Sequence, residues 1–195
     1  MLPERNPLVL AKQLATIDHL TGGRLELGIG VGWLQEEFDA LGVPFERRGR
    51  RTYEYLEAMH ALWASDDASY EGEFVNFRGM SCNPKPKHGQ VPTIVGGHSK
   101  PAMRRAARYG SGFFPATGAG LDPSGMINAL HAEAEAIGRH PAEIEVMTGC
   151  PDALPDSGKD PHATIAASTK AGVDRIALPL SAFCEDLDDS LAAYG

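Results

Sequence analysis

The segment Arg24-Leu-Glu-Leu-Gly-Ile-Gly-Val-Gly-Trp33 determines how the rest of this chain is interpreted. Side chains alternate along a β-strand, so its leucines and isoleucine would face one side while Gly28 and Gly30 face the other. Glycine leaves space beside a strand, which is typical of places where a ligand or another backbone comes close. Gly32 and Trp33 then add a turn and a large flat side chain. The segment predicts either a wall for a ring-shaped ligand or a strand with a flexible exit.

The composition is that of an ordinary globular protein. The chain has 195 residues, of which 43% are hydrophobic and 23% charged, enough for one sizeable core, so we expect a single domain over residues 1–195. No apolar run approaches the roughly 20 residues that span a bilayer. No basic-then-apolar leader is present, so we expect a cytoplasmic location.

Charge and cysteine content exclude several classes of function. The net charge of −8 argues against nucleic acid or an anionic membrane as the main partner. The three cysteines, Cys82, Cys150 and Cys184, lie far apart without a CxxC pattern. They indicate reduced thiols instead of a disulfide framework or a zinc site.

Strand and helix patterns alternate along most of the chain. Strands are expected near residues 25–29, 93–96, 112–114, 144–148 and 174–178, and a hairpin outside the main sheet near 70–77. Helices are expected over residues 7–20, 46–64, 99–109, 123–138, 162–171 and 185–194. This alternation predicts an α/β fold with a parallel sheet of about five strands, whose carboxyl ends share one face.

A second glycine loop, Val95-Gly-Gly-His-Ser99, would lie on that face. Gly96 and Gly97 let backbone N–H groups approach a ligand, and Ser99 is placed to cap the following helix. A helix start adds positive potential, so this loop is a candidate phosphate site. His98 would contact a phosphate or ring there, or be an ordinary loop residue.

The remaining reactive side chains show no catalytic pattern. No serine or cysteine stands in an elbow motif with a paired base, and the histidines have no metal-ligand spacing. The sequence therefore predicts no metal site, and it leaves the catalytic residues unidentified.

Several segments in combination resemble the luciferase-like monooxygenases, in particular the branch that depends on coenzyme F420, a deazaflavin. They cover essentially the whole chain: Arg5-Asn-Pro-Leu-Val-Leu-Ala-Lys-Gln13, Leu20 to Trp33, Leu41-Gly-Val-Pro-Phe-Glu-Arg-Arg48, Tyr55 to Trp63, Pro84-Lys-Pro86, Val95 to Ser99, Arg104 to Gly112 and Ala171-Gly-Val-Asp-Arg175.

The resemblance implies a fold and a cofactor. Family members are (β/α)8 TIM-type barrels, often dimers, that bind FMN or the deazaflavin at the strand carboxyl ends. The cofactor ring would face Gly28 and Gly30, with Gly32 and Trp33 beside it, and the cofactor phosphate would bind residues 96–99. Some flavin-binding relatives place a phosphate-binding arginine where this chain has Val31, which favours F420 over FMN. Arg48 or Arg51 could compensate, or both could be exposed helix residues.

An eight-stranded barrel needs roughly 250 residues, so the resemblance implies an incomplete barrel that lacks the family's N-terminal third. A gene model that starts late, a true truncation and completion by another chain all remain open. We expect an oxidoreductase that passes a hydride between F420 and a small organic substrate. The alternatives are an FMN-dependent monooxygenase and a non-catalytic remnant that only dimerises or binds a partner. Open sheet edges at residues 25–29 and 175–178 predict a homodimer.

Overall fold

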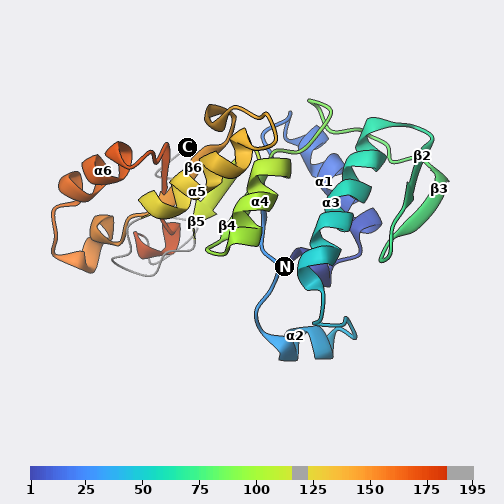
Figure 1. Ribbon diagram of the computed structural model, residues 1–195, viewed down its shortest axis with the longest axis horizontal. Coiled ribbons are helices and arrows are strands. Elements are labelled where there is room, and N and C mark those ends of the chain that lie inside the picture. Colours follow the sequence, from blue (N-terminus) through green and yellow to red (C-terminus); the bar gives the residue numbers. More distant parts are fainter. Residues whose placement is uncertain (116–122, 184–195) are drawn as a thin grey trace. The chain divides into compact units, whose positions relative to one another are not determined.

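The computed structural model describes residues 1–115 and 123–183 as an α/β fold (Figure 1). Five parallel strands form one sheet in the order β1-β4-β5-β6-β7, and two further strands form a separate antiparallel hairpin. The strands are β1 (Leu27–Ile29), β2 (Ala68–Glu71), β3 (Asn76–Met80), β4 (Thr93–Gly97), β5 (Gly112–Pro115), β6 (Glu145–Gly149) and β7 (Arg175–Ala177). The α-helices are α1 (Pro7–Leu20), α2 (Gln35–Ala40), α3 (Arg48–Ala64), α4 (Lys100–Tyr109), α5 (Ser124–Glu135) and α6 (Pro161–Lys170).

The chain forms two compact units, which are described separately. The first unit comprises Met1–Gly96 and Tyr109–Ser111, and the second comprises Gly97–Arg108 and the chain from Gly112 onward. The glycine segment at β1 therefore belongs to the first unit, and the start of α4 belongs to the second.

Helix α1 begins and ends at local sequence signals. The Asn6 Oδ1 accepts the Leu8 and Val9 N–H groups at 3.0 and 3.2 Å, which satisfies two of the helix's unpaired donors. Pro7 occupies the first helical position, where no N–H is needed. The helix ends at Leu20, before Gly22 and Gly23, which both have positive φ.

Small side chains let α1 pack closely on α3 (Figure 1). Ala11 and Ala15 are fully buried, and the Trp63 Nε1 on α3 donates to the Ala11 carbonyl at 3.1 Å. Leu14 on the same helix is also buried, at 7% exposure. Ile17 is 45% exposed and Leu20 80% exposed, so these two residues lie outside the core of the unit.

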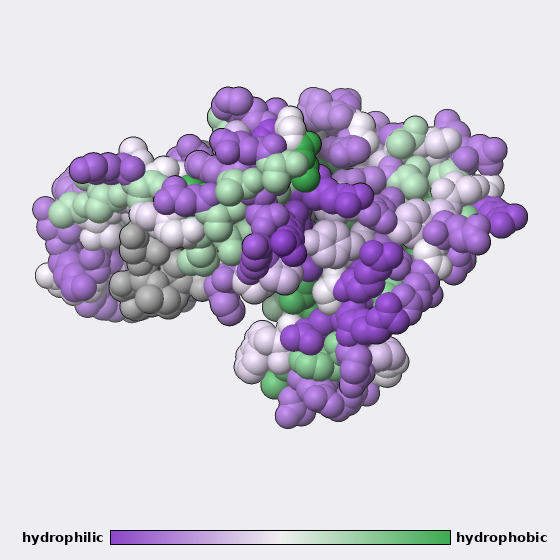
Figure 2. Space-filling model, viewed as in Figure 1, coloured by the Kyte–Doolittle hydropathy of each residue, from purple (hydrophilic) through white to green (hydrophobic). Residues whose placement is uncertain are grey.

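The β2–β3 hairpin packs against α3 through a buried polar network. The Glu57 carboxylate accepts the Tyr70 hydroxyl at 2.7 Å and also the Tyr109 hydroxyl. The Glu54 Oε2 accepts the Phe74 N–H at 2.7 Å. Figure 2 shows a hydrophilic surface over the first turns of α3 and the neighbouring end of the hairpin, where Arg47 forms an ion pair with Glu73.

The second unit is built around β5, β6 and α5. Phe113 and Leu130 are fully buried, and Ile127 and Val146 are 1% exposed. Strand β5 pairs with β6, and β6 pairs with β7, both in parallel register. The Asp174 Oδ2 accepts the Val146 N–H at 2.8 Å, which ties the start of β7 to β6.

The sequence-based elements are confirmed with shifts of a few residues at their ends. Helix α2 was not predicted, because six residues are too few to show a helical period. The expected helix over residues 185–194 lies outside the described residues. The fold class, five parallel strands with helices and a small hairpin, is confirmed.

Candidate functional site

The two glycines at the end of β1 differ in what lies beside them. Gly28 is exposed, and a Cβ added to it would meet no atom within 4 Å. A Cβ on Gly30 would lie 2.9 Å from the Met1 Sδ. The Leu2 N–H donates to the Gly30 carbonyl at 3.1 Å, so the first residues of the chain run beside this loop. Open space therefore remains at Gly28, while the Met1 thioether fills the space beside Gly30.

Gly32 is required by the packing of the loop that follows β1. Its φ is +82°, a conformation that residues with a Cβ rarely adopt. A Cβ here would lie 2.5 Å from the ring of Phe38, which is fully buried, and 3.0 Å from the Glu4 Oε1. The Arg48 Nε donates to the Gly32 carbonyl at 2.9 Å. Buried contacts to Phe38 and Arg48 thus fix the loop at Gly32, while Trp33 at its end is 75% exposed.

The two arginines considered as phosphate ligands have structural contacts. The Arg48 guanidinium lies 3.8 Å from the centroid of the Phe45 ring, in addition to its bond to Gly32. Arg51 is 4% exposed, and its Nη1 donates to the Pro44 carbonyl at 2.6 Å. Arg51 is therefore not the exposed helix residue that one sequence-based alternative described.

Strand β4 brings another glycine to the end of β1. The register pairs Leu27 with Thr93 and Ile29 with Val95. A Cβ on Gly96 would lie 3.3 Å from the Ile29 carbonyl oxygen. Glycine at position 96 lets the two strand ends come this close, and it places Gly96 beside the end of β1 within the first unit.

In the second unit, α4 begins directly after Ser99, where the sequence predicts its cap. The Ser99 carbonyl accepts the N–H groups of Ala102 and Met103 at 2.8 and 3.2 Å. Gly97 has φ +145°, and a Cβ there would lie 2.8 Å from that of Ala102. His98 and Ser99 are exposed. The start of α4 therefore places the exposed Ser99 hydroxyl at the positive end of the helix, where an anion is favoured.

The basic side chains of the first turns of α4 either lie next to a carboxylate or are buried. The Arg104 Nε lies 3.1 and 3.2 Å from the Glu133 carboxylate oxygens, and the Lys100 Nζ lies 3.7 Å from the same carboxylate. Arg105 is 2% exposed. Any anion at the start of α4 would be bound mainly by the Gly97–Ser99 backbone and the Ser99 hydroxyl.

Two side chains near Glu57 have shifted pKa values. Burial, followed by the hydrogen bond to Glu57, raises the pKa of Tyr70. Burial lowers the pKa of His60 despite the opposing charge of Glu57. The Tyr70–Glu57 hydrogen bond holds the hairpin on α3, and both groups lie on other elements than the glycine loops.

Glu4 was missed by the sequence analysis. It belongs to the 3₁₀ helix η1 (Leu2–Glu4), and its side chain is 10% exposed. Gly32, which is distant in sequence, lies beside it, and no local pattern distinguishes a buried glutamate from an exposed one.

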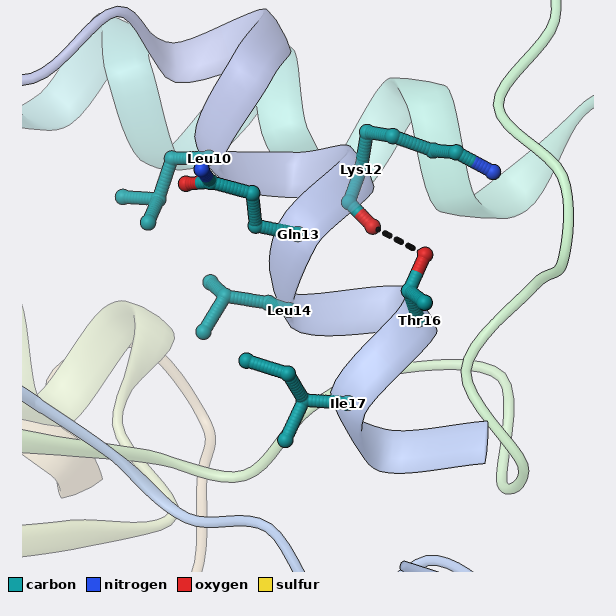
Figure 3. Close-up of a pocket in the computed structure, with 6 residues that line it drawn as sticks. All are labelled: Leu10, Lys12, Gln13, Leu14, Thr16 and Ile17. Carbon is teal, nitrogen blue, oxygen red and sulfur yellow. Dashed lines mark hydrogen bonds between the residues drawn. The ribbon is translucent and has the colours of Figure 1, made fainter. Parts of the chain in front are cut away.

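The described surface also has an apolar hollow on α1. It has a volume of about 510 Å³ and is lined by Leu10, Lys12, Gln13, Leu14, Thr16 and Ile17. Figure 3 shows Leu10, Leu14 and Ile17 pointing to the same side of the helix.

Within residues 1–115 and 123–183, no three histidine, cysteine or acidic residues are grouped so that they could hold a metal ion. In the same ranges, no helix is both long and apolar enough to cross a bilayer. Cys82 and Cys150 are buried free thiols.

Comparisons with known proteins identify relatives that use flavin or F420. An uncharacterized protein of Mycobacterium tuberculosis (strain ATCC 25618 / H37Rv) is 47% identical over 93 residues, which are 48% of this chain and 33% of that protein. The FMNH(2)-dependent dimethylsulfone monooxygenase of Pseudomonas putida is 34% identical over 145 residues, which are 72% of this chain and 40% of the enzyme. This chain thus spans well under half the length of these curated relatives.

A solved structure shares the fold at low sequence identity. The F420-dependent secondary alcohol dehydrogenase in complex with an F420-acetone adduct superposes with a TM-score of 0.71 and 17% identity, over 89% of this chain and 69% of that one. Neighbours of this chain are TIM-barrel luciferase-like enzymes that use F420 or FMN. Residues 1–175 match the sequence pattern of the protein family described as "Luciferase-like monooxygenase". This chain therefore belongs to the luciferase-like monooxygenase family.

Proposed function

We propose that this chain carries cofactor-binding elements of an oxidoreductase that transfers a hydride between coenzyme F420 and a small organic substrate. The observation that carries the proposal is the exposed backbone at Gly28, where a side chain would meet no atom within 4 Å. The glycine at that position is not required by packing, in contrast to Gly32 and Gly96. A glycine at position 28 instead leaves space for a flat ring against the strand.

The residues of the first unit would bind and orient the ring. The backbone at Gly28 gives a flat wall, and the Met1 thioether beside Gly30 gives a polarizable apolar contact. The exposed indole of Trp33 offers a face for stacking. The bound cofactor supplies the redox chemistry, and the chain supplies orientation and exclusion of water.

The residues at the start of α4 would bind a cofactor phosphate. Gly97 and His98 lead into α4, and the exposed Ser99 precedes its first turn. Backbone N–H groups at a helix start attract negative charge, and His98 stands next to them.

Position 31 supports F420 over FMN. Flavin-binding relatives are expected to use an arginine for the phosphate at this position, whereas Val31 has no hydrogen-bond donor in its side chain. Arg51 does not replace such an arginine, because it is 4% exposed and its guanidinium bonds to the Pro44 carbonyl.

The ring site is tested by filling the space at Gly28. We expect Gly28→Leu to weaken F420 binding by at least about tenfold, because the leucine occupies the ring position without disturbing the fold. Gly125→Leu is the matched control, since Gly125 is also exposed and has no atom within 4 Å of an added Cβ. Affinities come from fluorescence quenching titrations. Equal affinity of both variants and the unmodified chain would refute the ring site.

The phosphate site is tested at Ser99, because a side chain at Gly97 would clash with Ala102. Ser99→Asp adds a negative charge but keeps a good capping residue, so α4 should persist. We expect this variant to bind F420 much more weakly than Ser99→Asn, which caps equally well without the charge. Equal binding by the two variants would place the phosphate elsewhere.

We further propose that the protein is a cytoplasmic homodimer. The apolar hollow on α1 and the exposed Ile17 and Leu20 support a partner at this surface (Figure 3). Strands β1 and β7 end the sheet order, and edge strands are ready to pair. The buried free thiols Cys82 and Cys150 agree with a reducing compartment. Sedimentation at micromolar concentration should give a dimer, weakened by Ile17→Glu and unaffected by His19→Glu, an exposed position on the same helix. A folded monomer would refute the dimer.

One other function has an observation in its favour. The relative from Pseudomonas putida, an FMNH(2)-dependent monooxygenase, favours an FMN-dependent oxygenation. Tighter binding of FMN than of F420 would support this alternative.

A further inference from the structure

The Met1 thioether lies on the side of β1 where the cofactor ring is proposed. Residues two apart along a strand face the same side, so Gly30, directly after β1, faces the side of Gly28. A Cβ added to Gly30 would lie 2.9 Å from the Met1 Sδ and 3.7 Å from its Cε, whereas one at Gly28 would meet no atom within 4 Å. The Leu2 N–H bonds to the Gly30 carbonyl at 3.1 Å and holds the main chain there. The thioether therefore fills the Gly30 part of the proposed ring wall and leaves the Gly28 part open.

Met1 is also the methionine that a dissolved oxidant reaches best. The chain has six methionines, and Met1 is the most exposed of them at 48%. Met80 on the β2–β3 hairpin follows at 37%, and Met126 is half-buried. The other three are at most 7% exposed: Met59, Met103 and Met147. Because oxidation of side-chain sulfur follows exposure, Met1 should react first and Met80 next.

Oxidation changes what this side chain offers to a ring. As a thioether, Met1 gives an apolar, polarizable contact to an aromatic system. Hydrogen peroxide transfers one oxygen atom to the Sδ: the O–O bond breaks, an S–O bond forms, the sulfur loses two electrons, and the second oxygen leaves as water with both protons. The resulting sulfoxide is polar and has an oxygen that accepts hydrogen bonds. A ring lying against Gly30 would take water away from that oxygen, and this uncompensated loss weakens binding.

We infer that Met1 is a site of reversible oxidative modification that controls binding of the cofactor ring. The thioether form admits the ring, and the sulfoxide form binds it at least about fivefold more weakly. The oxidant is hydrogen peroxide, and methionine sulfoxide reductases reverse the modification. The inference rests on the proposed function for the presence of the ring.

The test uses the full chain treated with hydrogen peroxide, with the oxidation of each methionine followed by peptide mass spectrometry. Fluorescence quenching titrations with F420 then give the affinity as a function of the fraction of Met1 sulfoxide. We expect the affinity to fall at least about fivefold as Met1 is converted, and to return after treatment with methionine sulfoxide reductases. Bound F420 should also slow the oxidation of Met1 and leave that of Met80 unchanged.

Two variants separate Met1 from the other oxidisable residues. Met1→Leu, produced as a fusion whose leader is cleaved off before position 1, keeps an apolar side chain and should bind F420 equally well before and after peroxide. Met80→Leu, the matched control at the second most exposed methionine, should lose affinity as the unmodified chain does. A loss of affinity in peroxide-treated Met1→Leu, or unchanged affinity of the unmodified chain after complete conversion of Met1, would overturn the inference.

Thermal unfolding of the oxidised chain without ligand separates this role from a structural one. Because Met1 is 48% exposed, its oxidation should leave the melting temperature unchanged. A melting temperature that falls together with the affinity would show that the thioether serves the fold, and would overturn the inference. Failure of F420 to bind the untreated chain would instead refute the proposed function, and the inference with it.

Discussion

Gly32 and Gly28 stand four residues apart, yet alanine at the two positions should have opposite effects on stability. Gly32→Ala forces a residue with a Cβ into φ +82° and places that Cβ 2.5 Å from the Phe38 ring. The left-handed backbone costs about 1–2 kcal/mol. Phe38 is fully buried and packs edge-on against Phe45 at 5.2 Å, so its displacement adds about 1–3 kcal/mol of overpacking.

The expected loss for Gly32→Ala is therefore about 2–5 kcal/mol, or about 5–15 °C in melting temperature for a chain of this length. Gly28→Ala has open space around its Cβ and no positive φ. Because glycine weakens a strand relative to alanine, this variant should be unchanged or more stable by about 0.5–1 kcal/mol. Thermal unfolding followed by circular dichroism measures both variants. Equal losses in the two, or no loss in Gly32→Ala, would refute this assignment of the two glycines.

Three further predictions concern the surroundings of these elements. Asn6→Ala removes the cap of α1 and should cost about 1 kcal/mol in the free energy of unfolding by urea; an unchanged urea midpoint would contradict the cap. Burial holds the pKa of His60 below 6.5, so the unfolded chain binds more protons and stability falls as the pH drops below 6.5. His60→Gln should flatten the dependence of melting temperature on pH between about 6.5 and 5, and an unchanged slope would contradict this. The hydroxyl of Thr164, then Lys159, lowers the pKa of Asp152 below 3.8, so its stabilisation is complete above pH 3.8 and is lost as the pH falls through the folded-state pKa. Asp152→Asn should therefore lower the free energy of unfolding above pH 3.8 and leave it unchanged in strong acid. An effect of the same size at the two pH values would refute this role of the Asp152 carboxylate.

Local signals made α1 predictable. Asn6 and Pro7 start the helix, and Gly22 and Gly23 end it, wherever the rest of the chain lies. The glycine loops at β1 and β4 were found for the same reason, since glycine marks a close approach in the sequence itself.

Features that depend on distant residues could not be predicted. The open space at Gly28 and the filled space at Gly30 differ because Met1 reaches only the second. Arg51 resembles an exposed helix residue in the sequence, but the Pro44 carbonyl and the Phe74 ring hold it inside. Ala11 and Ala15 let Trp63 of α3 come close to α1, while Ile17 and Leu20 lie outside the core.

The central claim is that this member of the luciferase-like monooxygenase family binds the deazaflavin F420 at its glycine loops. Its most direct test is a pair of fluorescence quenching titrations of the purified chain with oxidised F420 and with FMN under the same conditions. The account predicts saturable binding of F420 with a dissociation constant lower than that for FMN. Tighter binding of FMN, or no binding of F420 by the folded chain, would contradict it.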